Sequence, residues 1–201
     1  MLRNHIAVHH PHFLAQYESF PRDRQRMNTA RYCLLKKLGG VYIDMDIECL
    51  RPIDSLLDGH DLMLSQTVGY NNAMIGSSPE HPLWRALFRN LHQGCTATLE
   101  DVGARMRSSE SMQISATVGP RFFSMSVTQS GVEDVESTLR CPGYFFEDSA
   151  PVSDKQLHRV EEPYGRHDMD MKWQSPLRRV ISRVSKVILP LARVVDRYSN
   201  D

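Results

Sequence analysis

The sequence lacks several features that would place it in a special class of protein. No apolar run approaches the ~20 residues of a membrane-spanning helix, and the first residues lack the apolar segment of a signal peptide. The cysteines form no C-x-x-C pair, which favours reduced thiols over a zinc site or a disulfide framework, although their even count leaves an oxidising lumen open. The four are Cys33, Cys49, Cys95 and Cys141.

An excess of charge of one sign is also missing. Lys plus Arg number 24 and Asp plus Glu number 24, so no overall field attracts nucleic acid, and we expect no nucleic-acid partner. The length of 201 residues and the hydrophobic fraction of 41% are those of an ordinary globular domain with a real core. The charge is uneven only near the C-terminus, where residues 172–197 hold seven basic residues and one acidic residue.

The segment from Gly39 to Asp46 is the most informative part of the sequence. Its polar and apolar residues alternate from residue 41 to 46, which predicts a strand with Asp44 and Asp46 on one face near its carboxyl end. Two neighbouring carboxylates repel each other unless a cation lies between them. Mg²⁺ and Mn²⁺ prefer oxygen ligands and often join protein carboxylates to phosphates. The alternative is a solvated strand end without a ligand.

A helix is predicted directly before this strand, over residues 23–38. It has start signals at Pro21 and Asp23 and a stop at Gly39. Its expected apolar stripe is Met27, Ala30, Leu34 and Leu38. Asn28 and Arg31 lie three residues apart and share one face, which can look onto the same cleft as the acidic pair. Gly39 and Gly40 permit positive φ and the close approach of a flat ligand or another backbone.

Other segments complete the expected α/β pattern. The histidines of residues 1–20 fit no zinc motif, and we expect a surface segment without metal. Strands are expected near residues 62–64, 70–75 and 141–146, and helices over residues 99–106 and from Arg121 onward. The capping-box spacing from Ser77 to Glu80 predicts another helix start. That helix is expected to bury Trp84, Leu87, Phe88 and Leu91.

The C-terminal residues 175–198 form a strong amphipathic pattern with basic residues on one side. A basic amphipathic helix can lie in an anionic membrane interface, so peripheral membrane contact is one expectation. Packing against the protein's own domain or against a partner is the other.

The central motif resembles the DXD region of glycosyltransferase family 32. The resemblance is carried by Arg26-x-Asn28-x-x-Arg31-Tyr32, by Gly39-Gly40-Val41-Tyr42-x-Asp44-x-Asp46 and by Arg51-Pro52-Ile53-Asp54. It continues through Asn71-Asn72-Ala73-Met74, His81-Pro82 and Thr117-Val118-Gly119-Pro120, and it ends near His167 and Trp173. The family includes inositol-phosphoceramide mannosyltransferases, fungal α-mannosyltransferases and bacterial capsule transferases.

The resemblance implies a GT-A-like α/β fold, with a mixed central sheet flanked by helices over residues 1–174 and a helical tail over residues 175–201. It also implies retaining transfer of a hexose from a nucleotide-diphosphate sugar, GDP-mannose or a UDP-hexose, to a glycan or glycolipid. The implied location is the cytoplasmic face of a membrane or the Golgi.

The resemblance assigns roles to individual residues. Mn²⁺ or Mg²⁺ would join Asp46 to the donor diphosphate, with Asp44 helping to place the metal and His167 as a third ligand. Asp44, Asp46 and Arg31 are the implied catalytic residues, and Asp44 would also contact the ribose or the donor sugar. Asn28 and Arg31 would hydrogen-bond the sugar hydroxyls. The further substrate-binding residues are Gly40, Tyr42, Asn71, Asn72, Gly119, Pro120 and Trp173.

Three departures from the family pattern are visible. Asn28 replaces the usual Asp, which removes a charge near the sugar, and Lys172 stands before Trp173 where the family often has Ser. The family's opening strand, which helps to hold the nucleotide base, has no counterpart in residues 1–12. Either the chain is a fragment or short isoform, or the base is held differently.

Two other functions remain as alternatives. A haloacid-dehalogenase-type phosphatase also places D-x-D at a strand end, but Glu48 stands where that motif has Thr or Val. A degenerate, non-catalytic transferase-like subunit would account for Asn28 and the missing opening strand. Hydrolysis of nucleotide sugars that depends on Mn²⁺ distinguishes an active transferase from both.

Overall fold

The computed structural model describes residues 1–98, 109–146 and 163–167. It begins with three helices, α1 (Leu2–His9), α2 (Pro11–Ser19) and α3 (Asp23–Leu38). Then follow β1 (Gly40–Ile43), β2 (Ile47–Cys49), α4 (Asp54–Leu57), β3 (Leu62–Gln66), β4 (Tyr70–Ser77) and α5 (Pro82–His92). The remaining elements are α7 (Glu110–Thr117), α8 (Pro120–Ser130), the 3₁₀ turns η1 (Val132–Asp134) and η2 (Gly143–Phe145), and the strands β5 (Thr138–Pro142) and β6 (Gly165–His167).

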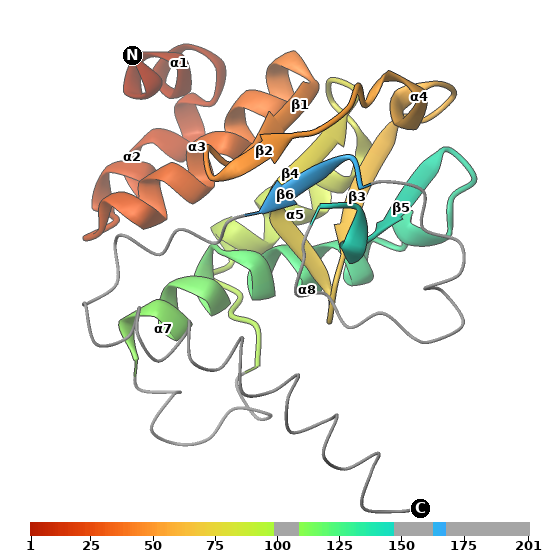
Figure 1. Ribbon diagram of the computed structural model, residues 1–201. Helices are drawn as coiled ribbons and strands as arrows, with labels where there is room; N and C mark the ends of the chain where they lie inside the picture. Colours follow the sequence, from red (N-terminus) through yellow and green to blue (C-terminus); the bar gives the residue numbers. More distant parts are fainter. Residues whose placement is uncertain (99–108, 147–162, 168–201) are drawn as a thin grey trace, which may run out of the picture.

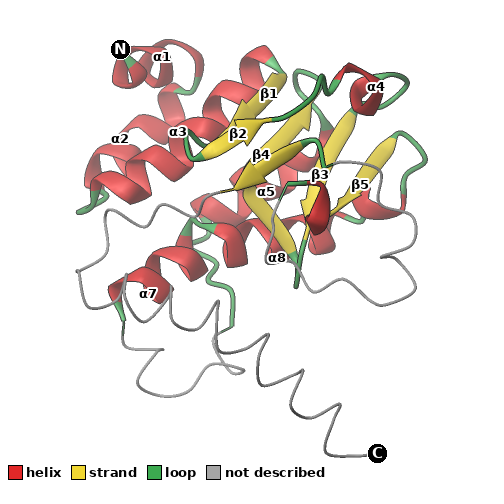
Figure 2. Ribbon diagram, in the orientation of Figure 1, coloured by secondary structure: helices red, strands yellow, loops and turns green. Residues whose placement is uncertain are grey.

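The main sheet has the strand order β1-β4-β3-β5 (Figure 1). β4 pairs antiparallel with β1 and β3, whereas β3 pairs parallel with β5, so the sheet is mixed. β2 and β6 form a separate antiparallel ribbon. Helices lie against the sheet (Figure 2). The expected α/β class, a mixed sheet flanked by helices, is confirmed.

Nearly every residue of β3 and β4 is buried, so both faces of the sheet are covered. Leu62 and Leu64 face the larger cluster, where Tyr32 of α3, Trp84 of α5 and the phenylalanines of α8 pack. Met63 and Met74 face the smaller cluster, which includes Cys141 and Phe146. Ile47 of β2 packs against this second cluster, and Gly165 of β6 approaches Phe146, so the ribbon lies on the face of the sheet opposite to α5 and α8.

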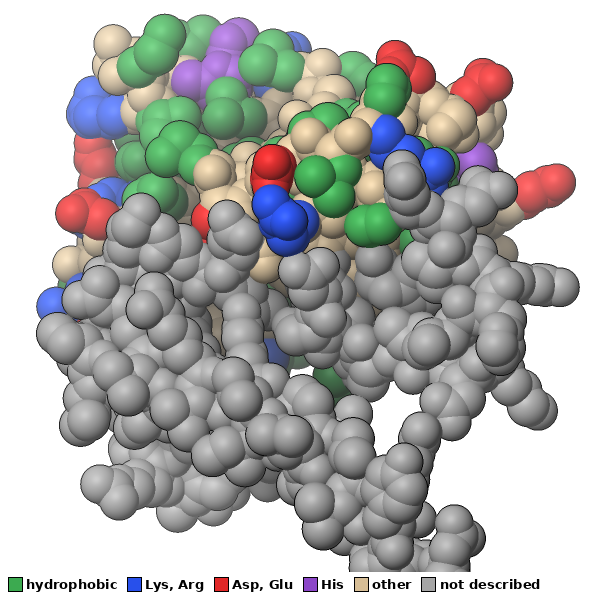
Figure 3. Space-filling model, viewed as in Figure 1, with side chains coloured by type: hydrophobic (Ala, Val, Ile, Leu, Met, Phe, Trp, Pro, Cys, Tyr) green, Lys and Arg blue, Asp and Glu red, His purple; other side chains and the backbone are tan. Residues whose placement is uncertain are grey.

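The N-terminal segment differs from the expected surface segment. Residues 2–19 form the helices α1 and α2, which bury Ile6, Phe13 and Tyr17 against the core. His10 lies between the two helices, is 9% exposed and stacks on Phe88 of α5. The spacings of seven and four residues between Ile6, Phe13 and Tyr17 are those of one helical face, so the sequence does carry this apolar pattern. Figure 3 shows histidine side chains gathered over these helices.

Helix α3 has the predicted bounds, and Ala30 of the predicted stripe is buried, but the buried face also includes polar residues outside that stripe. Met27 and Leu38 are 58% and 63% exposed, whereas Thr29, Arg31, Tyr32, Cys33 and Leu35 are buried. The apolar stripe did not mark the whole buried face, because polar side chains of this helix form hydrogen bonds in the protein interior. The face that carries Arg31 is therefore an inner face.

Three boundaries also differ from the sequence-based expectations. The first strand ends at Ile43 and not at residue 46. Helix α5 begins at Pro82, because Ser77 still belongs to β4 and the side chain of His81 caps the helix through the backbone N–H of Leu83. The expected late strand is β5 followed by η2.

The helix expected over residues 99–106 and the amphipathic tail lie outside the described residues, as does Trp173. The described helices include none that is both long and apolar enough to span a membrane.

Candidate functional site

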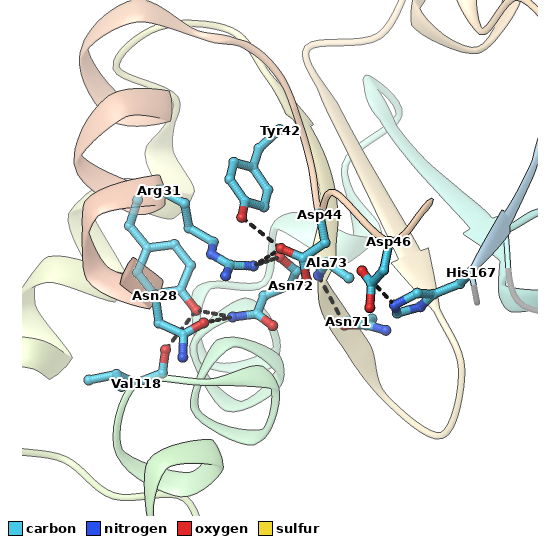
Figure 4. Close-up of polar contacts among 11 residues, drawn as sticks. Asn28, Arg31, Tyr42, Asp44, Asp46, Asn71, Asn72, Ala73, Val118 and His167 are labelled. Carbon is cyan, nitrogen blue, oxygen red and sulfur yellow. Dashed lines mark hydrogen bonds and ion pairs between the residues drawn. The ribbon is translucent and has the colours of Figure 1, made fainter. Parts of the chain in front are cut away.

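The two acidic residues of the D-x-D motif lie in a tight turn between β1 and β2. The backbone N–H of Asp44 donates to the carbonyl of Ala73 at 2.8 Å, the last link between this segment and β4. The chain then turns, and the N–H of Ile47 donates to the carbonyl of Asp44 at 3.1 Å. Because residues 44–46 are not extended, the carboxylates of Asp44 and Asp46 do not share a face. They point to different sets of partners (Figure 4).

Asp44 faces helix α3. Its Oδ1 lies 3.0 Å from Nη1 of Arg31 and accepts a hydrogen bond of 2.6 Å from the hydroxyl of Tyr42. The guanidinium of Arg31 also lies 4.3 Å above the ring of Tyr42. Burial raises the pKa of Tyr42 well above its ordinary value, with Arg31 acting in the opposite direction, so the hydroxyl keeps its proton. A charged acid, a charged base and a neutral phenol thus hold one another in place.

Arg31 is fixed to the sheet as well as to Asp44. Its side chain is 8% exposed, and Nη1 donates to the carbonyl of Asn72 on β4 at 2.7 Å. Its Nε is buried and makes no hydrogen bond in the structure. A guanidinium carries five donors. The contacts of Arg31 with Asp44 and with the carbonyl of Asn72 both use Nη1, so its other N–H groups remain as donors for a ligand.

A buried amide–hydroxyl network orients Asn28. The Nδ2 of Asn72 donates to Oδ1 of Asn28 at 3.1 Å and to the hydroxyl of Tyr32 at 2.9 Å, and that hydroxyl donates to the carbonyl of Val118 at 3.0 Å. Burial raises the pKa of Tyr32, so this hydroxyl remains neutral. The network joins α3, β4 and the segment between α7 and α8.

Asp46 faces the ribbon β2–β6. Its Oδ1 lies 3.3 Å from Nε2 of His167, which is the last residue of β6 and pairs with Ile47. His167 is 10% exposed in its side chain and Asp46 is 29% exposed. The sequence separates these two residues widely, and the ribbon brings them together.

A divalent cation fits this side of the turn. Carboxylate oxygen and imidazole nitrogen are both ligands of Mn²⁺, and such ions commonly take one or two protein ligands and complete their shell with phosphate and water. Asp46 and His167 provide this pair. The described residues contain no group of three or more His, Cys, Asp or Glu side chains placed to hold a metal. Asp44 is directed to Arg31 and Tyr42 instead of to this pair.

Among the remaining sequence-predicted residues, Asn71 lies on β4 beside Asn72, whereas Gly40 begins β1 at the end away from the acidic turn. Asn71 accepts from the N–H of Ala73 through its side chain at 3.0 Å, and Gly40 has a φ of 89° with open space around it. A Cβ at Gly119 would lie only 2.8 Å from Cα of Ser115, so the two backbones are in close contact there. Pro120 begins α8. Sequence reasoning missed Tyr32 as a member of the site, although it stands next to Arg31 in the motif.

Comparison with known proteins identifies the motif. Residues 2–63 match the family model described as "Glycosyltransferase sugar-binding region containing DXD motif". The chain is similar to DXD-motif glycosyltransferases. Within the DXD region, the turn after β1 carries the two acids, and α3 carries Arg31.

The curated relatives include enzymes of known type. The chain is 37% identical over 92 residues to inositol phosphoceramide mannosyltransferase 3 of Schizosaccharomyces pombe, a match of 45% of this chain and 26% of that protein. It is 35% identical over 88 residues to mannosyl phosphorylinositol ceramide synthase SUR1 of Saccharomyces cerevisiae, covering 43% and 23% of the two chains. The chain thus matches about a quarter of the length of these relatives.

A solved structure, the PaToxG glycosyltransferase, is also similar at 14% identity with a TM-score of 0.39, over 58% of this chain and 43% of that one.

Proposed function

We propose that this chain is the DXD-containing part of a glycosyltransferase that moves a hexose, most favourably mannose, from a nucleotide-diphosphate sugar to a glycolipid. The mannosyltransferases among its relatives act, by their names, on inositol phosphoceramide. An acceptor of this kind lies at a membrane, and the proposal therefore includes action at a membrane surface, with residues 175–198 as a candidate contact.

The observation that carries this proposal is the division of the two acids between different partners. Asp44 is held by Arg31 and Tyr42, and Asp46 stands beside His167. A nucleotide sugar presents two chemically different groups, a neutral polyhydroxylated ring and a charged diphosphate. One side of the turn offers fixed hydrogen-bonding groups, and the other offers ligands for a cation.

On the first side, the sugar would lie between Asp44, Arg31 and Asn28. The carboxylate of Asp44 accepts hydrogen bonds from hydroxyls, and the unengaged donors of Arg31 and the amide of Asn28 can donate to them. Because Arg31 is anchored to the carbonyl of Asn72, these groups are positioned before a ligand arrives. Positioned groups lower the barrier by removing the cost of orienting them.

On the second side, Asp46 and His167 would hold Mn²⁺ or Mg²⁺. Such an ion, when bound, neutralises the negative charge that develops on the departing diphosphate. The chain's own residues would hold the ion and orient the sugar. We further propose that transfer proceeds with retention, with the departing phosphate taking the acceptor proton, so no separate protein base is assigned.

A thermal-shift screen of the 201-residue chain tests the donor. GDP-mannose, UDP-galactose and UDP-glucose would each be added with and without Mn²⁺. One donor is expected to raise the melting temperature only when the metal is present, because ligands that bind only the folded state stabilise it. The variant Asp46→Asn serves as the control and should lose the metal-dependent shift. A chain that no nucleotide sugar protects in the presence of Mn²⁺ would contradict the proposal.

Transfer itself is tested with inositol phosphoceramide in detergent micelles, with mass spectrometry of the lipid. A mannosylated product that requires Mn²⁺ supports the proposed acceptor class. Donor binding without transfer or slow hydrolysis would instead favour a non-catalytic, transferase-like subunit, a reading that the replacement of the family's Asp by Asn28 motivates.

A further inference from the structure

Residues 164–167, which we call the clip, lie along the D-x-D turn and bring His167 to Asp46. In the register of the ribbon, Gly165 pairs with Cys49, Arg166 with Glu48 and His167 with Ile47. The backbone N–H of Leu50 donates to the carbonyl of Tyr164 at 2.9 Å. This ribbon has three residue pairs. A two-stranded ribbon of that length is not stable by its backbone hydrogen bonds alone, so the side-chain contacts matter.

The first contact holds the beginning of the clip. The guanidinium of Arg51 lies 3.6 Å from the centroid of the Tyr164 ring, and the Tyr164 hydroxyl is 3.4 Å from Oγ of Ser55. The same ring packs beside Phe145, with 5.3 Å between the centroids, and the N–H of Tyr164 donates to the carbonyl of Phe145. A cation–aromatic contact of this kind holds the ring against the chain that leaves β2.

The second contact is the close approach of the backbone at Gly165. A Cβ at this position would lie 3.0 Å from the carbonyl oxygen of Glu48, 3.2 Å from Phe146 and 3.3 Å from Ile47. Two of these neighbours are backbone or ring atoms that pack tightly. Glycine therefore lets β6 lie flat against β2, which sets the depth at which His167 meets Asp46.

The third contact is an ion pair next to the metal-binding pair. Arg166 and Glu48 form a salt bridge across the ribbon, one position before the pair of His167 with Ile47. Acidic and basic side chains lie side by side over β2 and β6 in Figure 3. Both side chains are about half exposed. Exposed pairs contribute little to stability, so this pair is better suited to fixing register than to holding the fold.

We propose that Arg51 and Glu48 are positioning residues, which hold the clip through Tyr164 and Arg166 so that His167 stands beside Asp46 and the two bind the cation of the donor complex. This inference rests on the proposed function, because it assigns a cation to Asp46 and His167. Contacts behind metal ligands typically change metal affinity by about 10- to 100-fold when they are removed.

Charge reversal separates positioning from simple electrostatics. In Arg166→Glu, the local charge becomes more negative, and Coulomb's law alone would tighten Mn²⁺ binding. The clip predicts the opposite result, a dissociation constant about tenfold higher, because Glu48 and the new carboxylate repel each other and separate β6 from β2. The double variant Glu48→Arg with Arg166→Glu restores the pair and is expected to restore the affinity.

The measurement is a Mn²⁺ titration of the 201-residue chain with GDP present, in which the free ion is followed by electron paramagnetic resonance. Arg51→Leu is expected to weaken binding as Arg166→Glu does, while Tyr164→Phe keeps the ring and should bind almost as the wild type. Melting temperatures identify any variant that fails to fold. If a single variant does not fold, recovery of Mn²⁺ affinity in the double variant tests the clip.

The outcomes separate a failure of the proposed cation site from a failure of the clip. A wild-type chain that binds Mn²⁺ no better than Asp46→Asn would overturn the proposed function and the clip with it. If the wild type binds Mn²⁺ and Asp46→Asn does not, but Arg166→Glu binds at least as tightly as the wild type, the proposed function stands and the clip is wrong.

Discussion

Asp44 and Asp46 are two residues apart, yet they belong to different parts of the molecule. Asp44 is tied through Arg31 to α3 and β4, which are continuous with the larger core cluster. Asp46 is tied through His167 to the ribbon β2–β6, whose Glu48–Arg166 pair is about half exposed. We call these the core side and the ribbon side of the site.

The difference predicts whether a substitution on each side lowers stability, function or both. A change on the core side removes partners of a buried charge, so it should reduce stability together with function. A change on the ribbon side should reduce function while the fold remains, because the exposed pairs there contribute little to folding.

The largest effect is expected for Arg31→Leu on the core side. Asp44 would lose its ion pair and Asn72 its buried donor, which should lower the free energy of unfolding by about 2 kcal/mol, a typical value for a hydrogen bond to a charged group. Transfer should fall by about 1,000-fold as the electrostatic contribution to the site is lost. Urea unfolding and a sugar-transfer assay measure the two quantities. A variant that stays fully stable would place Arg31 outside the core side.

Asp46→Asn should remove function without a cost in stability. Transfer is expected to fall by about 100-fold, because the amide cannot neutralise or ligate a cation as the carboxylate does. Its free energy of unfolding should stay within about 0.5 kcal/mol of the wild type, as for most surface changes. The same two assays apply, and an equal loss of stability in both variants would remove the contrast between the sides.

The sequence alone could predict the elements that build the core side. The bounds of α3, the positions of β3 and β4 and the buried stripe of α5 follow from local patterns of apolar residues and caps. The closeness of Arg31 to the acids was also predictable, because α3 runs directly into β1. Local patterns succeed here because each feature depends on residues near one another in the chain.

Local patterns could not predict the ribbon side, where only the family resemblance indicated His167 as a metal ligand together with Asp46. The contact of His167 with Asp46 depends on a pairing across more than a hundred residues, for which the sequence of β6 gives no periodic signal. The separation of the two carboxylates depends on a turn that the alternation of residues 41–46 conceals. Burial of Arg31 likewise required partners on β4, and propensity in α3 does not report them.

Tyr32→Phe tests how far the core side extends. The substitution removes a buried hydroxyl that accepts from Asn72 and donates to Val118, and we expect a loss of about 1.5 kcal/mol in the free energy of unfolding. Tyr17→Phe is the matched control, since Tyr17 is buried but its hydroxyl makes no hydrogen bond within the described residues. Equal stabilities of the two variants in urea would show that the network carries little energy.

Acid should weaken the core side through His10. Burial lowers the pKa of His10 below its ordinary value of 6.5, while its Nε2 stays hydrogen-bonded to the carbonyl of Cys33 on α3. The unfolded chain then binds a proton more readily, so stability is full above pH 6.5 and falls as the pH drops below it. Unfolding measured between pH 7.5 and 5, at about half-unit steps, checks this linkage. His10→Gln should reduce the dependence without abolishing it, because burial also lowers the pKa of His81, and His9→Gln, which alters an exposed ring, should leave it unchanged.

The smallest effect is expected for Met45→Ala. Met45 lies between the two acids and is fully exposed, so its removal should change the free energy of unfolding by less than about 0.5 kcal/mol. Its value is as a control for Asp46→Asn, because it alters the same turn without altering a charge. A large loss of stability would mean that the turn itself, and not its carboxylates, supports the fold.

The joint between α3 and β1 limits how the site can be moved to another protein. A Cβ at Gly39 would lie 2.6 Å from Cδ and 2.8 Å from the nitrogen of Pro79, and Lys36 beside it accepts from the N–H of Glu80 through its carbonyl. Residues 23–46 therefore cannot be transplanted as a single continuous piece. A designer who wished to graft the helix and its acidic turn would also have to carry residues 77–80 from a different stretch of the chain.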